Sequence, residues 1–314
     1  MIKVLIVCSG NVPNFIFEVH QAFVYDQVNA ISKNYPEINF DYFFIQGTGI
    51  NGYLSNLKRL KRQIKAQKFD VIHAHFGLSG LLANLQRSVP VICTFHGSDI
   101  NLLKNRFVSA LVTILSQKTI YVSKKLYNKA IFKKNKNIIS CGVNFEIFKP
   151  LNKELAKQRM NLNSAKNYIL FSSSFCNKIK NYQLLKEAHR LLKNRNIEIL
   201  ELKGYSREEV ALLINAADIC VMTSLSEGSP QFIKEAMACN CPIVSTDVGD
   251  VKDLISGTEG CYLTSFEPFD VAEKIKLAFA FEKRTKGREN IQQLDSKKIA
   301  ERIVLIYEKI LSVK

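Results

Sequence analysis

The sequence predicts an α/β protein with two doubly wound parallel sheets. Short apolar runs of strand length alternate along the whole chain with amphipathic segments of helical length, which is the pattern of repeated βαβ units. The chain has 314 residues, a length that accommodates two domains of ordinary size. Crossover connections between sequential parallel strands are right-handed, so each half of the chain should form an open sheet covered by helices.

The N-terminal half begins with an apolar strand over residues 2–8, followed by a turn-rich loop that contains Gly10. A long helix is expected over residues 15–32, and a second strand over residues 39–45 precedes a basic helix over residues 51–68. The loop after this first strand carries the lone Gly10 and lacks the dinucleotide-binding fingerprint G-x-G-x-x-G, which argues against an NAD-dependent dehydrogenase.

Three histidines stand at the ends of the next two strands. The strand over residues 69–75 contains His73 and His75, and the following strand ends at His96. The carboxyl ends of strands in an open α/β sheet line the ligand crevice, so all three positions are of interest. We expect His73 and His75 to point to opposite sides of their strand and therefore not to share a metal ion. We interpret His73 as a hydrogen-bonded core residue and leave the role of His75 open.

The stretch over residues 224–250 organises the C-terminal half. An apolar strand over residues 218–223 leads into a loop, and Ser229 and Pro230 are favoured at the N-cap and at the first position of a helix. An exposed helix N-terminus at the carboxyl end of a parallel sheet attracts anions such as phosphate. Glu227 and Glu235 bracket this helix entry, and a carboxylate can accept hydrogen bonds from both hydroxyl groups of a ribose. The alternative is that the two acids are solvated charges at an ordinary helix start.

The segment from Glu227 to Val244 resembles the E-x7-E signature of the retaining glycosyltransferases of family 4, which have the two-domain GT-B fold. The match includes the flanking Ala-Met-Ala and Pro-Ile-Val. The resemblance implies that Glu227 lies near the donor sugar, that Glu235 binds the ribose, and that amides between them contact the sugar and phosphate. The donor-binding residues that it implies in this segment are Gly228, Ser229, Pro230, Gln231 and Phe232.

Further segments extend the resemblance. Thr-Phe-His-Gly-Ser-Asp is similar to a family segment whose histidine faces the donor sugar, which assigns a catalytic role to His96. Lys180 matches a family lysine that contacts the diphosphate, and Gly204 and Tyr205 lie where the family binds the base. Gly10 stands in the first loop, where family members usually carry paired glycines close to the donor.

One departure from the family pattern concerns the leaving diphosphate. The family carries an arginine five residues before the lysine, and this sequence has Phe175 at that position. Two cations offset a departing diphosphate better than one. Lys178 or the loop amides are the expected substitutes for the missing charge.

The segment that ends at Pro150 resembles the family sequence that leads into the interdomain linker. We therefore expect an acceptor-binding Rossmann-like domain over residues 1–150 and a nucleotide-sugar-binding Rossmann-like domain over residues 151–295. A C-terminal helix over residues 296–314 should cross back to the first domain, with the active site in the central cleft, as in the GT-B fold.

Charge is distributed unevenly. The formal net charge is +16, and residues 1–150 contribute 19 basic and seven acidic side chains, a net +12. A basic N-terminal domain suggests an anionic partner, for which a membrane surface and a lipid-linked acceptor are the main candidates. Nucleic acid is the weakest candidate because the usual recognition motifs are missing. Biased composition is an alternative explanation of the lysine content.

No cofactor is expected. The sequence has no D-x-D motif, and Cys239-Asn-Cys241 without a second ligand pair makes a poor zinc site, so we expect no obligatory metal. The eight cysteines are interpreted as reduced thiols. No apolar run reaches the length of a transmembrane helix, so we expect a cytoplasmic protein that associates peripherally with the inner face of the membrane.

The resulting hypothesis is a retaining hexosyltransferase-type enzyme that transfers a sugar from a UDP-sugar to a lipid-linked saccharide in surface polysaccharide biosynthesis. The alternative is a non-catalytic sugar-nucleotide-binding or membrane-docking subunit of a glycosyltransferase complex, suggested by Phe175 and by the reduced glycine loop. A sugar-nucleotide epimerase on the same scaffold is disfavoured by the E-x7-E motif.

Overall fold

The computed structural model describes residues 1–134, 137–194 and 196–312, and these divide into two compact units. Unit 1 comprises residues 1–142 and 296–314, and unit 2 comprises residues 143–295. The prediction of two parallel α/β sheets is confirmed: each unit contains a five-stranded sheet in which all paired strands are parallel.

The sheet of unit 1 has the strand order β2-β1-β3-β4-β5. Its central strands are buried on both faces, which explains why apolar residues predominate in them; the buried polar side chains there are His73, His75 and Thr94. The strands are β1 (Ile2–Ser9), β2 (Ile38–Ile45), β3 (Val71–His75), β4 (Val91–Phe95) and β5 (Lys118–Tyr121).

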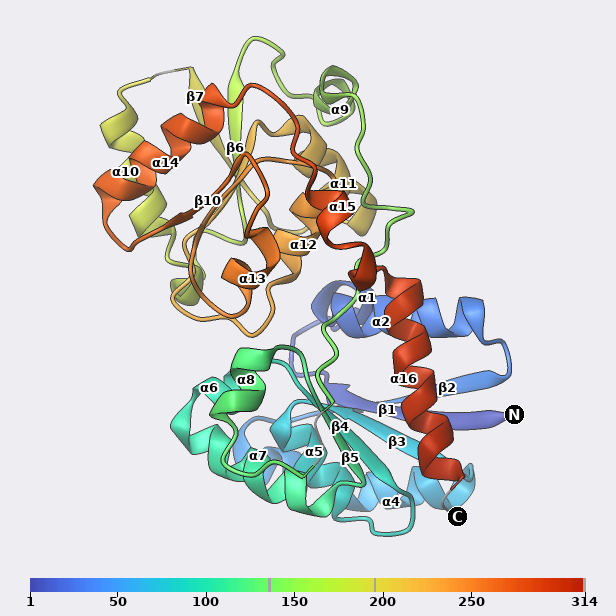
Figure 1. Ribbon diagram of the computed structural model, residues 1–314. Coiled ribbons are helices and arrows are strands. Elements are labelled where there is room, and N and C mark those ends of the chain that lie inside the picture. Colours follow the sequence, from blue (N-terminus) through green and yellow to red (C-terminus); the bar gives the residue numbers. More distant parts are fainter. Residues whose placement is uncertain (135–136, 195, 313–314) are drawn as a thin grey trace. The chain divides into compact units, whose positions relative to one another are not determined.

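Helices cover both faces of this sheet. Figure 1 shows α2 and α16 side by side on one face, and α4, α5 and α7 on the other. The helices of unit 1 are α1 (Phe17–His20), α2 (Ala22–Asn34), α3 (Gly49–Leu54), α4 (Leu57–Ala66), α5 (Gly77–Asn84), α6 (Ser98–Asn101), α7 (Leu103–Leu115), α8 (Lys124–Lys129) and α16 (Ser296–Leu311).

The single helix expected over residues 15–32 is wrong, because the chain forms two helices that break at Gln21. Gln21 has a non-helical backbone (φ −132°, ψ 42°), and its side-chain amide donates to the Ser9 carbonyl over 3.2 Å. This bond ties the helix entry to the carboxyl end of β1, so α2 begins one residue later at Ala22.

The C-terminal helix α16 is part of unit 1. Its buried apolar residues Ile299, Ile303, Tyr307 and Ile310 recur at helical spacing and form one stripe. Each fully buried side chain of this size contributes about 1.5–3 kcal/mol. Docking of α16 therefore adds substantially to the stability of a domain from which it is separated by more than 150 residues of sequence.

Unit 2 repeats the same topology. Its strand order, β10-β9-β8-β6-β7, becomes 2-1-3-4-5 when the strands are renumbered within the unit, as does the order in unit 1. The strands are β6 (Asn167–Phe171), β7 (Ile197–Glu201), β8 (Ile219–Met222), β9 (Ile243–Thr246) and β10 (Cys261–Thr264). The helices are α9 (Lys153–Arg159), η1 (Lys178–Lys180), α10 (Tyr182–Leu192), α11 (Arg207–Ala216), α12 (Gln231–Ala238), α13 (Val251–Ile255), α14 (Pro268–Ala280), α15 (Gly287–Asn290) and η2 (Gln292–Leu294).

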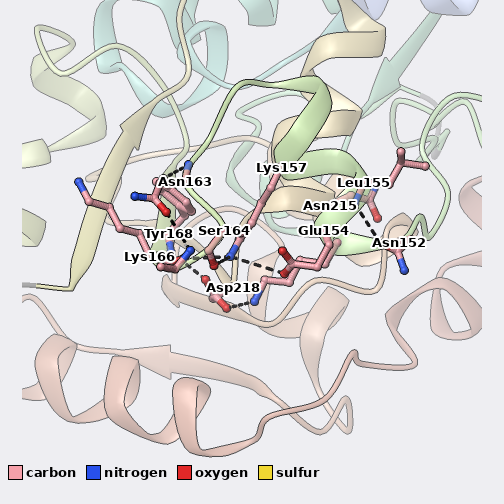
Figure 2. Close-up of polar contacts among 12 residues, drawn as sticks. Asn152, Glu154, Leu155, Lys157, Asn163, Ser164, Lys166, Tyr168, Asn215 and Asp218 are labelled. Atoms are coloured by element: carbon pink, nitrogen blue, oxygen red, sulfur yellow. Dashed lines mark hydrogen bonds and ion pairs between the residues drawn. The ribbon is translucent and has the colours of Figure 1, made fainter.

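A polar network attaches α9 to the sheet of unit 2 (Figure 2). Lys157 is buried, and its ammonium group donates to the carbonyls of Ser164 and Lys166 over 3.1 and 3.0 Å. Asp218 accepts from the backbone amide of Tyr168 over 2.7 Å at the start of β6. Burial of a lysine is costly unless its donors are satisfied, so this network fixes the path of the chain before β6.

Candidate active site

The predicted site residues of unit 2 lie in the loops that follow its strands. In a parallel sheet these loops meet at the carboxyl edge, and ligands bind where the strand order reverses. In unit 2 this switch point lies between β6 and β8, which pair with each other. The loop after β6 carries Lys180 and the loop after β8 carries Glu227, so the topology itself brings these two segments together.

Lys180 and Glu227 form an ion pair. The ammonium nitrogen lies 2.5 Å from a carboxylate oxygen of Glu227, and both side chains are largely buried. The two loops are also joined through the backbone: the Leu225 amide donates to the Ile179 carbonyl over 2.8 Å, and the Thr223 hydroxyl donates to the Lys180 carbonyl over 3.1 Å. The structure thus places the predicted catalytic cation beside the predicted catalytic acid.

The helix N-terminus expected in this region is present and differs by one position at its cap. Helix α12 begins at Gln231 and its N-cap residue is Pro230, which has no side-chain acceptor for the first-turn amides. The expectation that Ser229 caps the helix is wrong, because its hydroxyl instead hydrogen-bonds Asp250. The first-turn amides of α12 are suited to an anionic ligand.

The loop after β9 packs closely on the loop after β8. Gly249 has φ +60°, and a Cβ atom at this position would lie 2.8 Å from the Gly228 carbonyl oxygen. Glycine is required there for both reasons. Burial raises the pKa of the neighbouring Asp250, and this rise is partly offset by the buried Lys234 and by the hydrogen bond from Ser229. The predicted loop residues Gly228 and Ser229 therefore both contact the loop after β9, Gly228 through close packing with Gly249 and Ser229 through its hydrogen bond to Asp250.

Glu235 pairs with Arg207, a residue that the sequence analysis did not identify. A guanidinium nitrogen of Arg207 lies 2.7 Å from one carboxylate oxygen of Glu235. The side chain of Arg207 is 12% exposed and that of Glu235 is 4% exposed. The guanidinium group also lies over the ring of Phe148, 4.7 Å from its centroid. One sequence signal was available: Ser206 and Glu209 form a capping box, which marks a helix start directly after the loop expected to bind the base.

Gly204 and Tyr205 lie in the loop between β7 and this capping box. Gly204 has φ +79°, and no atom stands within 4 Å of the position that a Cβ would occupy. Tyr205 is exposed. The loop therefore presents backbone and an aromatic ring at the carboxyl edge, as a base-binding role requires, and that role stays a prediction.

Phe175 occupies the place of the family's arginine and packs inward. Its ring stacks on Tyr182 with centroids 3.8 Å apart and an interplanar angle of 16°. Its backbone amide donates to Glu201 over 2.7 Å. Lys178 is exposed in η1, two residues before Lys180. The aromatic stack thus anchors the loop and contributes no charge to it.

In unit 1, Gly10 and His96 follow β1 and β4. The Gly10 amide donates to the Ile45 carbonyl over 2.9 Å. Nε2 of His96 lies 3.0 Å from Nδ1 of His75, and its Nδ1 lies 3.7 Å from the sulfur of Cys141. Both ring nitrogens of His96 thus face partners within unit 1. A hydrogen bond from His96 to a sugar would therefore have to replace its contact with either His75 or Cys141.

The expected opposite orientation of His73 and His75 is wrong. Side chains two residues apart on a strand point to the same face, and the two rings stack with centroids 4.5 Å apart. The core interpretation of His73 is confirmed: it is buried, and its ring nitrogens lie 2.7 Å from the hydroxyl groups of Tyr307 and Thr94. Burial lowers the pKa of His73 to about 3, and burial together with the His73 and His96 rings holds the pKa of His75 well below its usual value.

A cavity of about 740 Å³ lies at the opposite, amino-terminal edge of the unit 2 sheet. It is lined by residues at or just before the strand starts, among them Asn167, Asp218 and Pro242, and by the end of α14. None of the predicted site residues lines it, and Asp218 is paired with Lys153. Because the carboxyl edge carries the ion pair and the helix N-terminus, the candidate site is placed there and not in this cavity.

Within the described residues, no group of three or more histidine, cysteine, aspartate or glutamate side chains is arranged to hold a metal ion. All eight cysteines are free thiols, and Cys239 and Cys241 are both buried. Among the helices of the described residues, none has the length and apolar character needed to cross a bilayer.

Comparisons with known proteins cover both units. The family described as "Glycosyltransferase Family 4" matches residues 4–146, and the family described as "Glycosyl transferases group 1" matches residues 188–280. An uncharacterized glycosyltransferase of Methanocaldococcus jannaschii is 29% identical over 277 residues, which cover 79% of this chain and 74% of that protein. A Bacillus subtilis glycosyltransferase named for teichuronic acid biosynthesis is 28% identical over 59% of this chain and 55% of its own length.

Solved structures show the same fold. Sucrose-phosphate synthase from Thermosynechococcus elongatus superposes with a TM-score of 0.84 at 16% identity, with all of both chains covered. HepE from Anabaena, in complex with UDP and glucose, gives a TM-score of 0.73 at 17% identity over 98% of this chain and 100% of that chain. The predicted fold class, a GT-B protein with two Rossmann-like parallel-sheet domains, is confirmed.

Proposed function

Because the chain belongs to the family 4, group 1 glycosyltransferases, which are enzymes of hexosyltransferase type, we propose that it transfers a sugar from a UDP-sugar to a hydroxyl group with retention of anomeric configuration. Its activity serves polysaccharide or glycoconjugate biosynthesis. The acceptor that we propose is a lipid-linked saccharide, in line with the relative named for teichuronic acid biosynthesis and with the basic charge of the N-terminal half. The UDP assignment is supported by the complex of HepE with UDP and glucose.

The observation that carries the proposal is the pairing of Lys180 with Glu227 beside the N-terminus of α12. In the proposed reaction the bond between the anomeric carbon and the diphosphate oxygen breaks, and the diphosphate leaves with an additional negative charge. The acceptor hydroxyl oxygen forms the new bond to the anomeric carbon on the same face, and its proton passes to the departing diphosphate. Lys180 and the first-turn amides of α12 stabilise that charge from fixed positions. Electrostatic stabilisation by such preorganised groups is usually the largest single contribution to catalysis. Glu227, released from Lys180 by the phosphate, orients the sugar.

The ribose contact is assigned to Glu235. One of its carboxylate oxygens bonds Arg207, which leaves the other available to accept from a ribose hydroxyl. The proposed reaction uses no obligatory metal, since the cationic groups named above can balance the diphosphate. His96 keeps its proposed contact with the donor sugar.

Calorimetric titration with UDP and with GDP in the presence of EDTA tests the nucleotide and the metal together. We expect UDP to bind in EDTA, and we expect Glu235→Gln to weaken that binding at least about tenfold because a charge-assisted hydrogen bond to the ribose is lost. Glu273→Gln is the matched control, since Glu273 is a half-exposed acid of the same unit whose ion pair is with Lys276 on its own helix.

The transfer itself is tested with UDP-sugars and a polyprenyl-diphosphate-linked saccharide, with the anomeric configuration of the product read by NMR. Retention supports the proposal, and inversion overturns its stereochemical part. If neither nucleotide binds the wild-type protein, the non-catalytic docking subunit becomes the better description.

A further inference from the structure

One region of unit 1 is almost free of negative charge. Between Asp70 and Glu146 the sequence contains ten lysines and arginines and a single acid, Asp99. Asp99 is buried, and it accepts hydrogen bonds from the backbone amides of His96 and Gly97. The surface that this part of the chain presents is therefore basic.

Helix α7, which lies in this region, exposes an apolar stripe. Leu103, Phe107, Leu111 and Ile114 follow one another at helical spacing, and they are 67%, 68%, 46% and 49% exposed. The opposite side of the same helix carries its buried residues and packs mainly against α5 and α6. Single exposed apolar residues are ordinary, but a contiguous row of them on one helix face indicates a surface that binds a partner or a membrane.

The chain after α8 adds two more apolar side chains next to this stripe. Ile131 and Phe132 are exposed, and the Lys134 ammonium group donates to the carbonyls of Ile114 and Ser116 at the end of α7. These bonds place the segment over residues 131–134 beside the C-terminal end of α7. Residues 135 and 136, at the end of the lysine-rich run, lie outside the described residues.

Lysines surround these apolar side chains. Lys104 is exposed in the first turn of α7, and Lys133 and Lys134 follow Phe132 directly. Lys129 donates to Asn101, which ties α8 to the end of α6, and Figure 1 shows α6, α7 and α8 grouped at one side of unit 1. We call this surface the α7 face and define it by Leu103, Lys104, Phe107, Leu111, Ile114, Lys129, Ile131, Phe132, Lys133 and Lys134.

We propose that the α7 face docks unit 1 on an anionic lipid bilayer. Apolar side chains that enter the headgroup boundary, next to lysines that attract anionic lipids, are the features of interfacial membrane binding. A second copy of this chain is a poor occupant, because two lysine-rich faces would repel each other. The proposal rests on the lipid-linked acceptor proposed above. Docking of unit 1, the unit expected to bind the acceptor, would bring it to the bilayer surface that holds such an acceptor.

Vesicle flotation without donor or acceptor tests the docking independently of sugar transfer. We expect binding to vesicles of phosphatidylcholine with 30% phosphatidylglycerol, little binding to pure phosphatidylcholine, and weaker binding in 0.5 M than in 0.1 M salt because added ions screen the attraction. Each lysine near an anionic surface changes the partition roughly fivefold, so Lys104→Gln with Lys133→Gln should reduce binding on the order of 25-fold.

Matched variants locate the surface. Phe107→Ser should weaken vesicle binding roughly tenfold or more, because an apolar side chain no longer enters the bilayer. Phe269→Ser in unit 2 is the control, since Phe269 is equally exposed at 69% and lies outside the α7 face, and it should leave binding unchanged. Lys58→Gln with Lys61→Gln on the basic helix α4 controls for a general charge effect and should reduce binding much less than the α7 pair.

The proposal is overturned by no binding to anionic vesicles, by equal loss in the Phe107 and Phe269 variants, or by equal loss in the two lysine pairs. Sedimentation that shows a dimer abolished by Phe107→Ser would assign the α7 face to self-association instead. A protein that floats with vesicles but does not transfer sugar contradicts the proposed function alone. One that transfers sugar but does not float contradicts the docking alone.

Discussion

The guanidinium group of Arg207 lies 2.7 Å from the Glu235 carboxylate, and both side chains are almost completely removed from solvent. The pair joins the start of α11 to the middle of α12. The contact engages one carboxylate oxygen of Glu235 and fixes the orientation of the group, so the ribose contact proposed above is assigned to the other oxygen. Any substitution of Glu235 therefore also removes one member of a buried ion pair.

A double-mutant comparison separates the two roles. Removal of one member of a buried ion pair leaves an uncompensated charge and typically costs about 3–5 kcal/mol, whereas replacement of both members by apolar residues is often close to neutral. We expect Glu235→Leu and Arg207→Met each to lower the free energy of unfolding by about that amount, and the double variant to recover most of it in urea titrations. The double variant should still fail to bind UDP. Recovery of nucleotide affinity together with stability would remove Glu235 from the ribose site.

Lys180→Met should lower kcat by about 10²–10³, because one fixed cation for the leaving diphosphate is lost. KM for the donor should change less, since the charge that Lys180 offsets grows as the bond breaks. Lys178→Met is the control: Lys178 is exposed on the same short 3₁₀ helix, and its loss should change kcat only slightly. If both variants lose activity equally, Lys178 supplies the charge that the family takes from arginine.

Tyr307→Phe tests the attachment of α16 to unit 1. The Tyr307 hydroxyl lies 2.7 Å from Nδ1 of His73, and both residues are fully buried. Removal of the hydroxyl leaves a buried polar nitrogen without this partner, which costs about 1–3 kcal/mol. We expect a loss of that size in urea unfolding. The conservative control Tyr262→Phe, at a partly buried strand position in unit 2, should cost less. An equal loss in the two variants would contradict a special role of the His73 contact.

Two buried groups of unit 1 give opposite pH dependences. Burial lowers the pKa of His73 to about 3, so between about pH 6.5 and 3 the unfolded chain binds a proton that the folded chain does not, and stability falls as the pH falls. Burial raises the pKa of Asp99 to about 6, with backbone hydrogen bonds opposing the rise, so from about pH 6 to 4 the folded chain binds the extra proton and stability rises as the pH falls.

Substitution of either group should change the acid limb of stability in a known direction. We expect Asp99→Asn to make the loss of stability from pH 6 to 4 steeper by about 1.4 kcal/mol per pH unit, and His73→Gln to make it shallower by a similar amount. Urea unfolding at pH 4, 5, 6 and 7 measures both slopes. An Asp99→Asn slope equal to that of the wild type would show that this carboxyl group titrates normally.

The acids of the candidate site are predicted from sequence through a local signal, and their roles stay predictions. Glu227, Gly228 and Pro230 lie within one loop and helix entry, where turn, cap and helix preferences operate over a few residues. Lys180 was identified only through family resemblance, and its partner could not be deduced from spacing, since 47 residues separate it from Glu227. Arg207 was missed because its role depends on a carboxylate 28 residues later in the chain.

The sequence by itself determined the alternation of strands and helices, the parallel sheets and the position of the anion-attracting helix, because apolar periodicity and backbone capping are properties of neighbouring residues. Only the tertiary structure decided which groups meet. The reversal of strand order between β6 and β8 brings Lys180 to Glu227, and the folding of α16 onto unit 1 brings Tyr307 to His73. These contacts join distant segments, and they are fixed by how the buried faces of sheets and helices pack, which no local pattern encodes.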